Sequence, residues 1–334
     1  LSKFDTSNVI NMESLFYNCV SLKEINISNF NTSIVINMRN MFNNCKSLTT
    51  LNFPNNFKTN TVENMDSMFK NCESLIKLEI SNFVTSKVVN MESMFDGCMN
   101  LKYLIFNNDN FETKNVKNME YMFSNCQELE SLNISKFNTS SVTNMRNMFE
   151  SCKKLTNIDV NQFNTKKVTN MESMFSNCRE LVSIDVSKFD TSLVINMEKM
   201  FELCPKLTSL YVSNFDTSKV TNMDKMFSNC QSVTELNISN FDVRSLIKAS
   251  GMFEYCSKLI SINFHHFYTY NVIDMSYMFY DCISLKNLEL SSFKTESVTD
   301  MSFMFYGCQV LTSINLINFD TLSIINMNSM FEDC

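Results

Sequence analysis

The residues of this chain that could do chemistry are its thirteen cysteines and two adjacent histidines, His265 and His266. Thiols can bind metals, form disulfides or act as nucleophiles, and imidazoles can bind metals or transfer protons. The cysteines recur every 26 to 28 residues without any C-x-x-C pair, which argues against a metal site. Neighbouring residues on a strand point to opposite faces, so we do not expect the histidines to share a metal.

The cysteines mark a sequence repeat that runs through the whole chain. Counted from its first phenylalanine, the consensus reads F-x-T-S-x-V-x-N-M-x-x-M-F-x-x-C-x-x-L-x-x-L-x-I-S-x. Such a short unit cannot bury its apolar residues alone, so neighbouring units must stack into a solenoid. All thirteen cysteines belong to the series. We therefore expect residues 1–334 to form one domain, a fragment of a longer array without capping repeats.

The middle of the repeat has the spacing of a short helix. Its two methionines, second phenylalanine and cysteine stand at i, i+3, i+4 and i+7, on one face of about two helical turns. Asn or Asp precedes the first methionine in twelve repeats, and Lys248 is the exception. Either side chain makes a good helix N-cap, because its oxygen accepts an unpaired backbone N–H group. We therefore predict one two-turn helix in each repeat.

The end of the repeat has the spacing of a strand. Ile184 and Val186 are apolar and flank the polar Asp185, a pattern that recurs along the chain. It predicts a short strand with one buried face and one wet face. The expected fold is an α/β solenoid of the leucine-rich-repeat type, with about 12–13 repeats of 26 residues. Its curved parallel sheet would line the concave face and its short helices the convex face.

Two units carry a family resemblance. FNTSSVTNMRNMFESCKKLTNIDV (137–160) and FDTSKVTNMDKMFSNCQSVTELNIS (215–239) resemble the BspA-like leucine-rich repeats of microbial surface proteins. The resemblance implies a protein that is secreted or attached to the cell surface. It also implies a function in adhesion, because some members of that family bind host extracellular proteins. No functional residue carries over, because the shared motif is the scaffold itself.

The methionines and cysteines are interpreted as core residues. Twenty-four of the 25 methionines occupy the two helix positions, and Leu15 replaces one of them in register, so core packing is favoured over soft-metal binding. We expect buried free thiols, because packed helices lie ~8–10 Å apart, too far for disulfides between repeats. Disulfides between neighbouring repeats stay open as an alternative. Free thiols also count against a surface location, since secreted proteins usually pair their cysteines.

Candidate binding residues come from the exposed side of the predicted sheet. Solvent-facing strand residues of successive repeats form mostly polar columns, in which tyrosines are good anchors for a partner. From this surface we select six residues: Glu79, Tyr103, Asp159, Asp185, Tyr211 and Glu289.

The repeat pattern breaks in two ways: insertions lengthen two repeats at 53–57 and 106–111, and one repeat loses its consensus residues. Thr holds the third position in twelve of thirteen repeats, but Val243 stands there instead, and Lys248 replaces the Asn of the same repeat. The next segment, INFHHFYTY, contains both His265 and His266 among aromatic residues. This segment is a candidate binding hot spot or pH-sensitive contact, with simple drift of the repeat as the alternative reading.

Charge, hydropathy and the lack of catalytic motifs argue against three classes of function. The formal charge is −7 and no Lys/Arg run exists, so no nucleic-acid partner is expected. No stretch approaches 18 apolar residues, so no membrane span is expected. No catalytic motif or singular constellation of reactive groups is found, so we expect neither an enzyme nor a cofactor.

We therefore predict a binding protein, a cell-surface or secreted adhesin or interaction module. Its partner would be a protein or glycan macromolecule, such as host extracellular matrix. The alternative is an intracellular or virion scaffold that acts as a spacer. Exposed apolar ends of the array would also favour end-to-end self-association.

Overall fold

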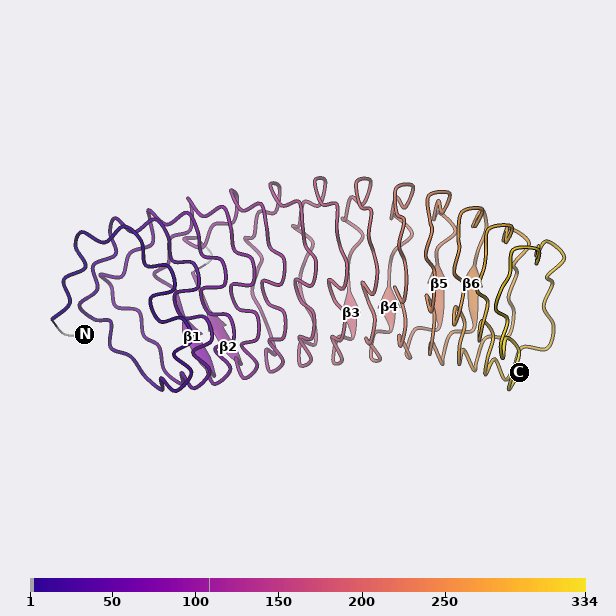
Figure 1. Ribbon diagram of the computed structural model, residues 1–334, viewed down its shortest axis with the longest axis horizontal. Coiled ribbons are helices and arrows are strands. Elements are labelled where there is room, and N and C mark those ends of the chain that lie inside the picture. The colour runs from indigo at the N-terminus through magenta and orange to yellow at the C-terminus, as the bar shows by residue number, and fades with distance from the viewer. Residues whose placement is uncertain (1–2, 108) are drawn as a thin grey trace. The chain divides into compact units, whose positions relative to one another are not determined.

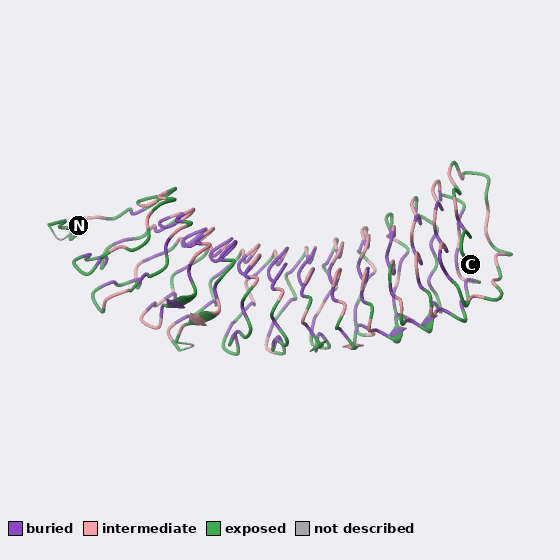
Figure 2. Cartoon of the chain, turned by 90° about the horizontal axis from the view of Figure 1, so that it is seen from below, coloured by how far each residue is buried: buried purple, intermediate pink, exposed green. Residues whose placement is uncertain are grey.

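The computed structural model describes residues 3–107 and 109–334. The chain divides into two compact units, Leu1–Lys167 and Val168–Cys334. Each unit is a stack of similar coils, and each coil corresponds to one sequence repeat (Figure 1). Buried residues recur at the same level of successive coils (Figure 2). Each unit is therefore a solenoid of stacked repeats, as the repeat period predicts.

Short parallel strands form where the sequence alternates. In the first unit, β1 (Lys77–Glu79) pairs with β2 (Tyr103–Ile105), with Leu78 opposite Leu104. In the second, β3 (Ser183–Ile184) pairs with β4 (Ser209–Leu210), and β5 (Glu235–Asn237) pairs with β6 (Ser261–Asn263). The strands are short because a repeat alternates over only three residues before it turns. The central residue of β1, β5 and β6 is buried and its neighbours are exposed, as predicted.

The predicted helices are wrong. In the described residues the M-x-x-M-F-x-x-C segment is a run of turns. In one repeat, the amide of Met41 donates to the carbonyl of Met38 (3.2 Å), and the amide of Cys45 donates to that of Phe42 (3.1 Å). The third residue of each turn, Asn40 or Asn44, has a positive φ, which no α-helix allows. Two consecutive turns place their apolar side chains on one side with the same i, i+3, i+4, i+7 spacing.

Hydrogen bonds between repeats explain why turns replace a helix. The amide of Asn40 donates to the carbonyl of Asp66 (2.9 Å), and the amide of Asn44 donates to that of Lys70 (2.8 Å). Donors that a helix would bond internally thus bond to the next coil instead. The positive-φ positions turn these amides outward, and they are mostly Asn, Ser or Gly, residues that suit turns.

The conserved Asn position makes the predicted capping contact, but on a turn. The Asn118 side-chain oxygen accepts the Glu120 amide (3.0 Å), and its amide group donates to Glu92 of the preceding repeat (2.8 Å). Where Lys248 replaces the asparagine, Asp224 of the preceding repeat accepts the Ser250 amide instead (2.8 Å). The same backbone donor is therefore satisfied by a different residue.

The core of each unit consists of columns of identical side chains. Phenylalanine rings stack along the repeats, as in Phe69–Phe95 (5.7 Å between centroids) and Phe201–Phe227 (6.1 Å). The methionines beside them are buried, which confirms their interpretation as core residues. Offset aromatic stacking and apolar burial hold the coils together.

A column of buried threonines connects the coils on another side. The Thr139 hydroxyl donates to the Asn164 carbonyl (3.0 Å) and accepts the Asn164 amide (2.8 Å). Thr32 makes the same pair of bonds with Lys58, and Thr295 makes it with Asp320. One hydroxyl thus satisfies both backbone groups of a residue in the next repeat.

Candidate binding surface

The exposed strand face is held rigid by its own polar side chains. Asp159 accepts the Asn161 amide (3.0 Å), Asp185 accepts the Ser187 amide (2.9 Å) and Glu289 accepts the Ser291 amide (2.9 Å). These bonds close the turn that follows each of these positions, of which only Asp185 directly follows a strand, β3. The predicted binding carboxylates therefore have a structural function, and each retains a second oxygen for a partner.

Asp185 and Glu79 differ in how they are prepared for a partner. Hydrogen bonds from the Ser187 side chain and backbone lower the pKa of Asp185 below its usual value, so it stays ionised. Glu79 lies at the exposed end of β1 and forms an ion pair with Lys77 (3.1 Å). Ion pairs this exposed contribute little to stability, so Glu79 can change partners at little cost.

The tyrosines provide the apolar part of this face. Tyr103 is 53% exposed on β2, opposite Lys77 of β1, and the Lys102 ammonium lies 5.7 Å from its ring centroid. Tyr211 directly follows β4 and is 65% exposed. Side chains this exposed can still bury much of their surface against a partner. Glu79, Tyr103 and Asp159 belong to the first unit, and the other five candidates belong to the second.

The histidine pair lies outside the strands, which corrects the expectation that its members face opposite sides. Strand β6 ends at Asn263, and His266 has a positive φ of 66°. The turn brings the rings of His265 and His266 to 3.9 Å between centroids. Among the described residues, no group of three or more His, Cys, Asp or Glu side chains could hold a metal ion.

The break in the threonine column accounts for this local change. Val243 has no hydroxyl, so it cannot bond to the backbone of Tyr268, the residue that a threonine there would contact. The Tyr268 amide donates instead to the His266 carbonyl (2.9 Å), two residues back. The positive φ of His266 permits this tight turn.

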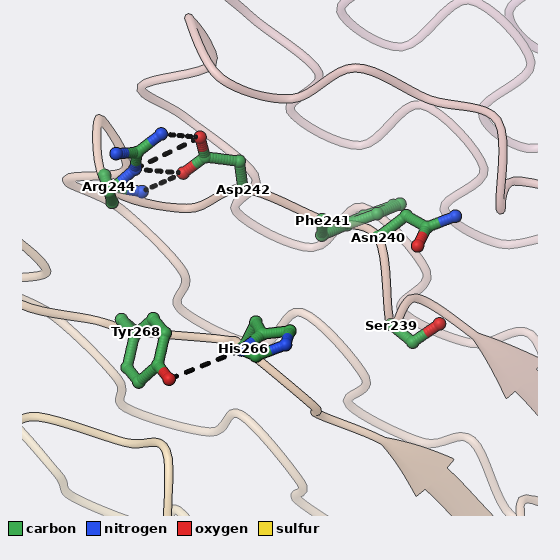
Figure 3. A pocket seen from close by; sticks show the side chains of 7 residues that line it. All are labelled: Ser239, Asn240, Phe241, Asp242, Arg244, His266 and Tyr268. Atoms are coloured by element: carbon green, nitrogen blue, oxygen red, sulfur yellow. Dashed lines mark hydrogen bonds and ion pairs between the residues drawn. The ribbon is translucent and has the colours of Figure 1, made fainter.

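A cavity of about 410 Å³ opens beside the break, within the second unit (Figure 3). Its lining residues come from two segments, 239–244 and 266–268: Ser239, Asn240, Phe241, Asp242, Arg244, His266 and Tyr268. The sequence analysis identified the break and His266 but missed Asp242 and Arg244. The sequence could have pointed to these two residues, because both flank Val243, where the repeat loses its threonine.

The polar groups of the cavity form two separate pairs (Figure 3). The Arg244 guanidinium donates to the Asp242 carboxylate, with the shortest contact at 2.6 Å. This pairing lowers the pKa of Asp242 and raises that of Arg244, so both stay charged. His266 Nδ1 lies 3.3 Å from the Tyr268 hydroxyl. The cavity is therefore lined by hydrogen-bond donors, hydrogen-bond acceptors and aromatic rings. Its Arg244–Asp242 pair carries no net charge.

The cysteines are free in the structure, and eleven of the thirteen are buried. The Cys152 thiol donates to the Phe123 carbonyl of the preceding repeat (3.2 Å). Burial raises its pKa to about 12, so it carries no thiolate at neutral pH. Such thiols are poor nucleophiles and metal ligands.

Comparisons with known proteins agree with the repeat architecture. A family model described as "Mycoplasma protein of unknown function, DUF285" matches residues 1–108, 99–184, 180–287 and 258–334. Together these matches extend over the whole chain. The expected resemblance to bacterial leucine-rich-repeat surface proteins is confirmed. The comparison with curated proteins gave no match.

Several solved structures are similar to the chain. A leucine-rich-repeat protein of Bacteroides ovatus is 19% identical, with a TM-score of 0.42, over 98% of this chain and 75% of the other. A leucine-rich cell surface protein of Faecalibacterium prausnitzii is 20% identical, with a TM-score of 0.40, over 95% and 75%. InlJ of Listeria monocytogenes, described as including a cysteine ladder, is 18% identical, with a TM-score of 0.25, over 82% and 64%. No helix in the described part of the chain is long and apolar enough to cross a membrane.

Proposed function

The chain belongs to the DUF285 family, and we propose that it is a non-enzymatic binding protein, an adhesin at the cell surface or in secreted form. Its exposed strand face would engage a protein or glycan macromolecule such as host extracellular matrix. The adhesive function and the location rest on the resemblance of its repeats to BspA-like surface proteins.

One observation carries the proposal: the polar strand face is ordered before any partner arrives. The bonds from Asp159 to the Asn161 amide and from Asp185 to the Ser187 amide hold each carboxylate in place. A surface that is already ordered loses little conformational entropy on binding. Repetition of such contacts along the coils lets many weak interactions add up.

Free cysteines are compatible with an oxidising environment in this fold. The thiolate is the form that reacts, and burial raises the pKa of Cys152 to about 12 and that of Cys126 well above its usual value. The eleven buried thiols are thus protected by packing, whereas Cys19 is half-buried and Cys334 is exposed. The free cysteines therefore do not favour the scaffold alternative over an adhesin.

The test is binding of the purified chain to immobilised matrix proteins and glycans. Monodispersity is checked first, because Ile317, Leu322 and Ile325 are each more than four-fifths exposed and favour self-association. The test variants are Asp185→Asn and Tyr211→Ala. Asparagine keeps the acceptor for the turn amide and removes only the charge, so the fold is retained.

A matched control removes an aromatic side chain from another part of the repeat. Tyr255 is 37% exposed at a positive-φ turn position, away from the strands, and Tyr255→Ala serves this purpose. Saturable binding that is weakened by Tyr211→Ala but not by Tyr255→Ala supports the proposal. Binding by neither the parent nor any variant, across the whole panel, refutes it and favours the scaffold alternative.

A further inference from the structure

The cavity beside Val243 has a chemistry of its own, and we propose that it binds an uncharged sugar residue of a glycan. This inference rests on the proposed binding function and specifies one ligand class and one site for it. It is carried by the break in the threonine column and by the side chains that face the resulting space.

The cavity has a structural cause. The Thr217 hydroxyl donates to the Asp242 carbonyl (2.9 Å), and the Thr269 hydroxyl donates to the Lys294 carbonyl (2.6 Å). Between these two contacts Val243 offers no hydroxyl, and the Tyr268 amide turns back to the His266 carbonyl. The backbone around 266–268 is thereby released from the preceding repeat. The cavity lies where this connection is lost.

The size of the cavity fits a small ligand. Its volume of about 410 Å³ lies within the range of roughly 300–1,000 Å³ that small-molecule sites occupy. The second histidine extends the polar surface, because His265 and Glu289 line a neighbouring cavity of about 130 Å³. Glu289 is also one of the residues predicted from the strand face.

Charge balance favours an uncharged ligand, because the Arg244–Asp242 pair presents no net charge to attract an ion, although a pair this exposed contributes little to stability. The Arg244 guanidinium is neutralised by Asp242, with Nε and Nη2 donating to the two carboxylate oxygens (2.6–3.2 Å). An anionic ligand would have to compete with Asp242 for this guanidinium. A cationic ligand would meet Arg244 itself. A neutral ligand disturbs neither charge.

The hydrogen-bonding groups suit neighbouring hydroxyls. Arg244 keeps its Nη1 donors outside the pair with Asp242, and the Asp242 oxygens have further lone pairs to accept with. A donor and an acceptor side by side match two adjacent hydroxyl groups, each of which both donates and accepts. Ser239 and Asn240 add polar groups at the far end of the cavity (Figure 3).

The aromatic rings that line the cavity can contact the apolar C–H face of a sugar. His266 and Tyr268 lie opposite the Arg244–Asp242 pair in Figure 3, and Tyr268 is 36% exposed. The negative face of an aromatic ring attracts the slightly positive C–H groups of a pyranose. A sugar therefore finds polar partners for its hydroxyls on one side and rings for its C–H face on the other.

The decisive variant is Val243→Thr. It restores the hydroxyl that other repeats carry, so the Tyr268 backbone can bond to the preceding repeat and the cavity should close. Tyr268→Ala removes a ring of the cavity without relying on that rearrangement. Tyr255→Ala is the matched control, because it removes an exposed tyrosine of the same unit outside both the cavity and the strand face. Circular dichroism establishes that each variant is folded.

The probes are immobilised uncharged hexose and N-acetylhexosamine oligosaccharides, each beside its sialylated form. We expect saturable binding of uncharged oligosaccharides, weakened at least tenfold by Val243→Thr and by Tyr268→Ala but not by Tyr255→Ala. No binding of any oligosaccharide overturns the inference, as does a preference for the sialylated forms or unchanged binding by both cavity variants. If a protein partner is still bound through Tyr211 in those cases, the proposed function survives and only the sugar site is lost.

Discussion

Replacing one buried threonine by valine tests whether the hydroxyl column holds the coils together. Thr139 has no measurable exposure, and its hydroxyl makes bonds of 3.0 and 2.8 Å to the carbonyl and amide of Asn164. Valine has nearly the same shape, so Thr139→Val opens no cavity. The substitution removes two inter-repeat hydrogen bonds and leaves the two backbone groups of Asn164 without this partner.

The expected magnitude follows from the two lost bonds. Each neutral hydrogen bond contributes about 1 kcal/mol net, so the loss is about 2 kcal/mol, and more if Asn164 cannot reach water. Since 1.4 kcal/mol corresponds to a tenfold change in an equilibrium constant, the constant for local opening should rise by about 30-fold. This equilibrium is read directly as the hydrogen-exchange protection of the Asn164 amide.

A matched control makes the same chemical change at the surface. The Thr49 hydroxyl is exposed and makes one bond, to the Lys23 carbonyl at 3.1 Å. Thr49→Val should change stability by less than about 0.5 kcal/mol. If Thr139→Val leaves both urea unfolding and the exchange of Asn164 within the range of Thr49→Val, the hydroxyl column does not connect the repeats and the reasoning is wrong.

Three further predictions concern other columns. Asn118→Ala should cost about 1–2 kcal/mol in urea unfolding, because it removes the bonds to the Glu120 amide and the Glu92 carboxylate; an unchanged midpoint would contradict this. Gly97→Ala should destabilise by about 1–2 kcal/mol, because φ is 73° and the new Cβ would lie 2.2 Å from the Asn71 side-chain oxygen, and adding Asn71→Ala should recover part of the loss. Alkali should destabilise the fold, because burial raises the pKa of the Cys152 thiol to about 12. The stability that comes from keeping this thiol protonated is complete below about pH 8.5, the pKa of a free cysteine, and is lost as the pH rises towards 12. Between those pH values, Cys152→Ala should reduce the pH slope of the unfolding free energy by about 1.4 kcal/mol per pH unit. An unchanged slope would show that this thiol has the same pKa in the folded and unfolded states.

The candidate site was only partly visible in the sequence. The loss of threonine at Val243 and the pair His265–His266 lie beside the cavity. The expectation of opposite-facing histidines is wrong, because it assumes a strand and β6 ends at Asn263. Asp242 and Arg244 carry no signal in the sequence as a pair, because a carboxylate and a guanidinium two residues apart are common on a protein surface.

The sequence by itself determined the repeat, its core and its capping contacts. A period near 26 residues requires stacking, and buried methionine, phenylalanine and cysteine positions follow from apolar spacing alone. The asparagine before the first methionine is expected from the sequence to accept a backbone amide, and Asn118 does so from Glu120, although on a turn and not on a helix.

Only the tertiary structure decided between helix and turns. The spacing of Met38, Met41, Phe42 and Cys45 is the same in both, so periodicity cannot separate them. The difference lies in where the backbone amides go. In a helix they bond within the segment, whereas here the Asn40 amide reaches the Asp66 carbonyl of the next coil. That partner is 26 residues away, and stacking against it is what makes the positive-φ turn more favourable than a helix.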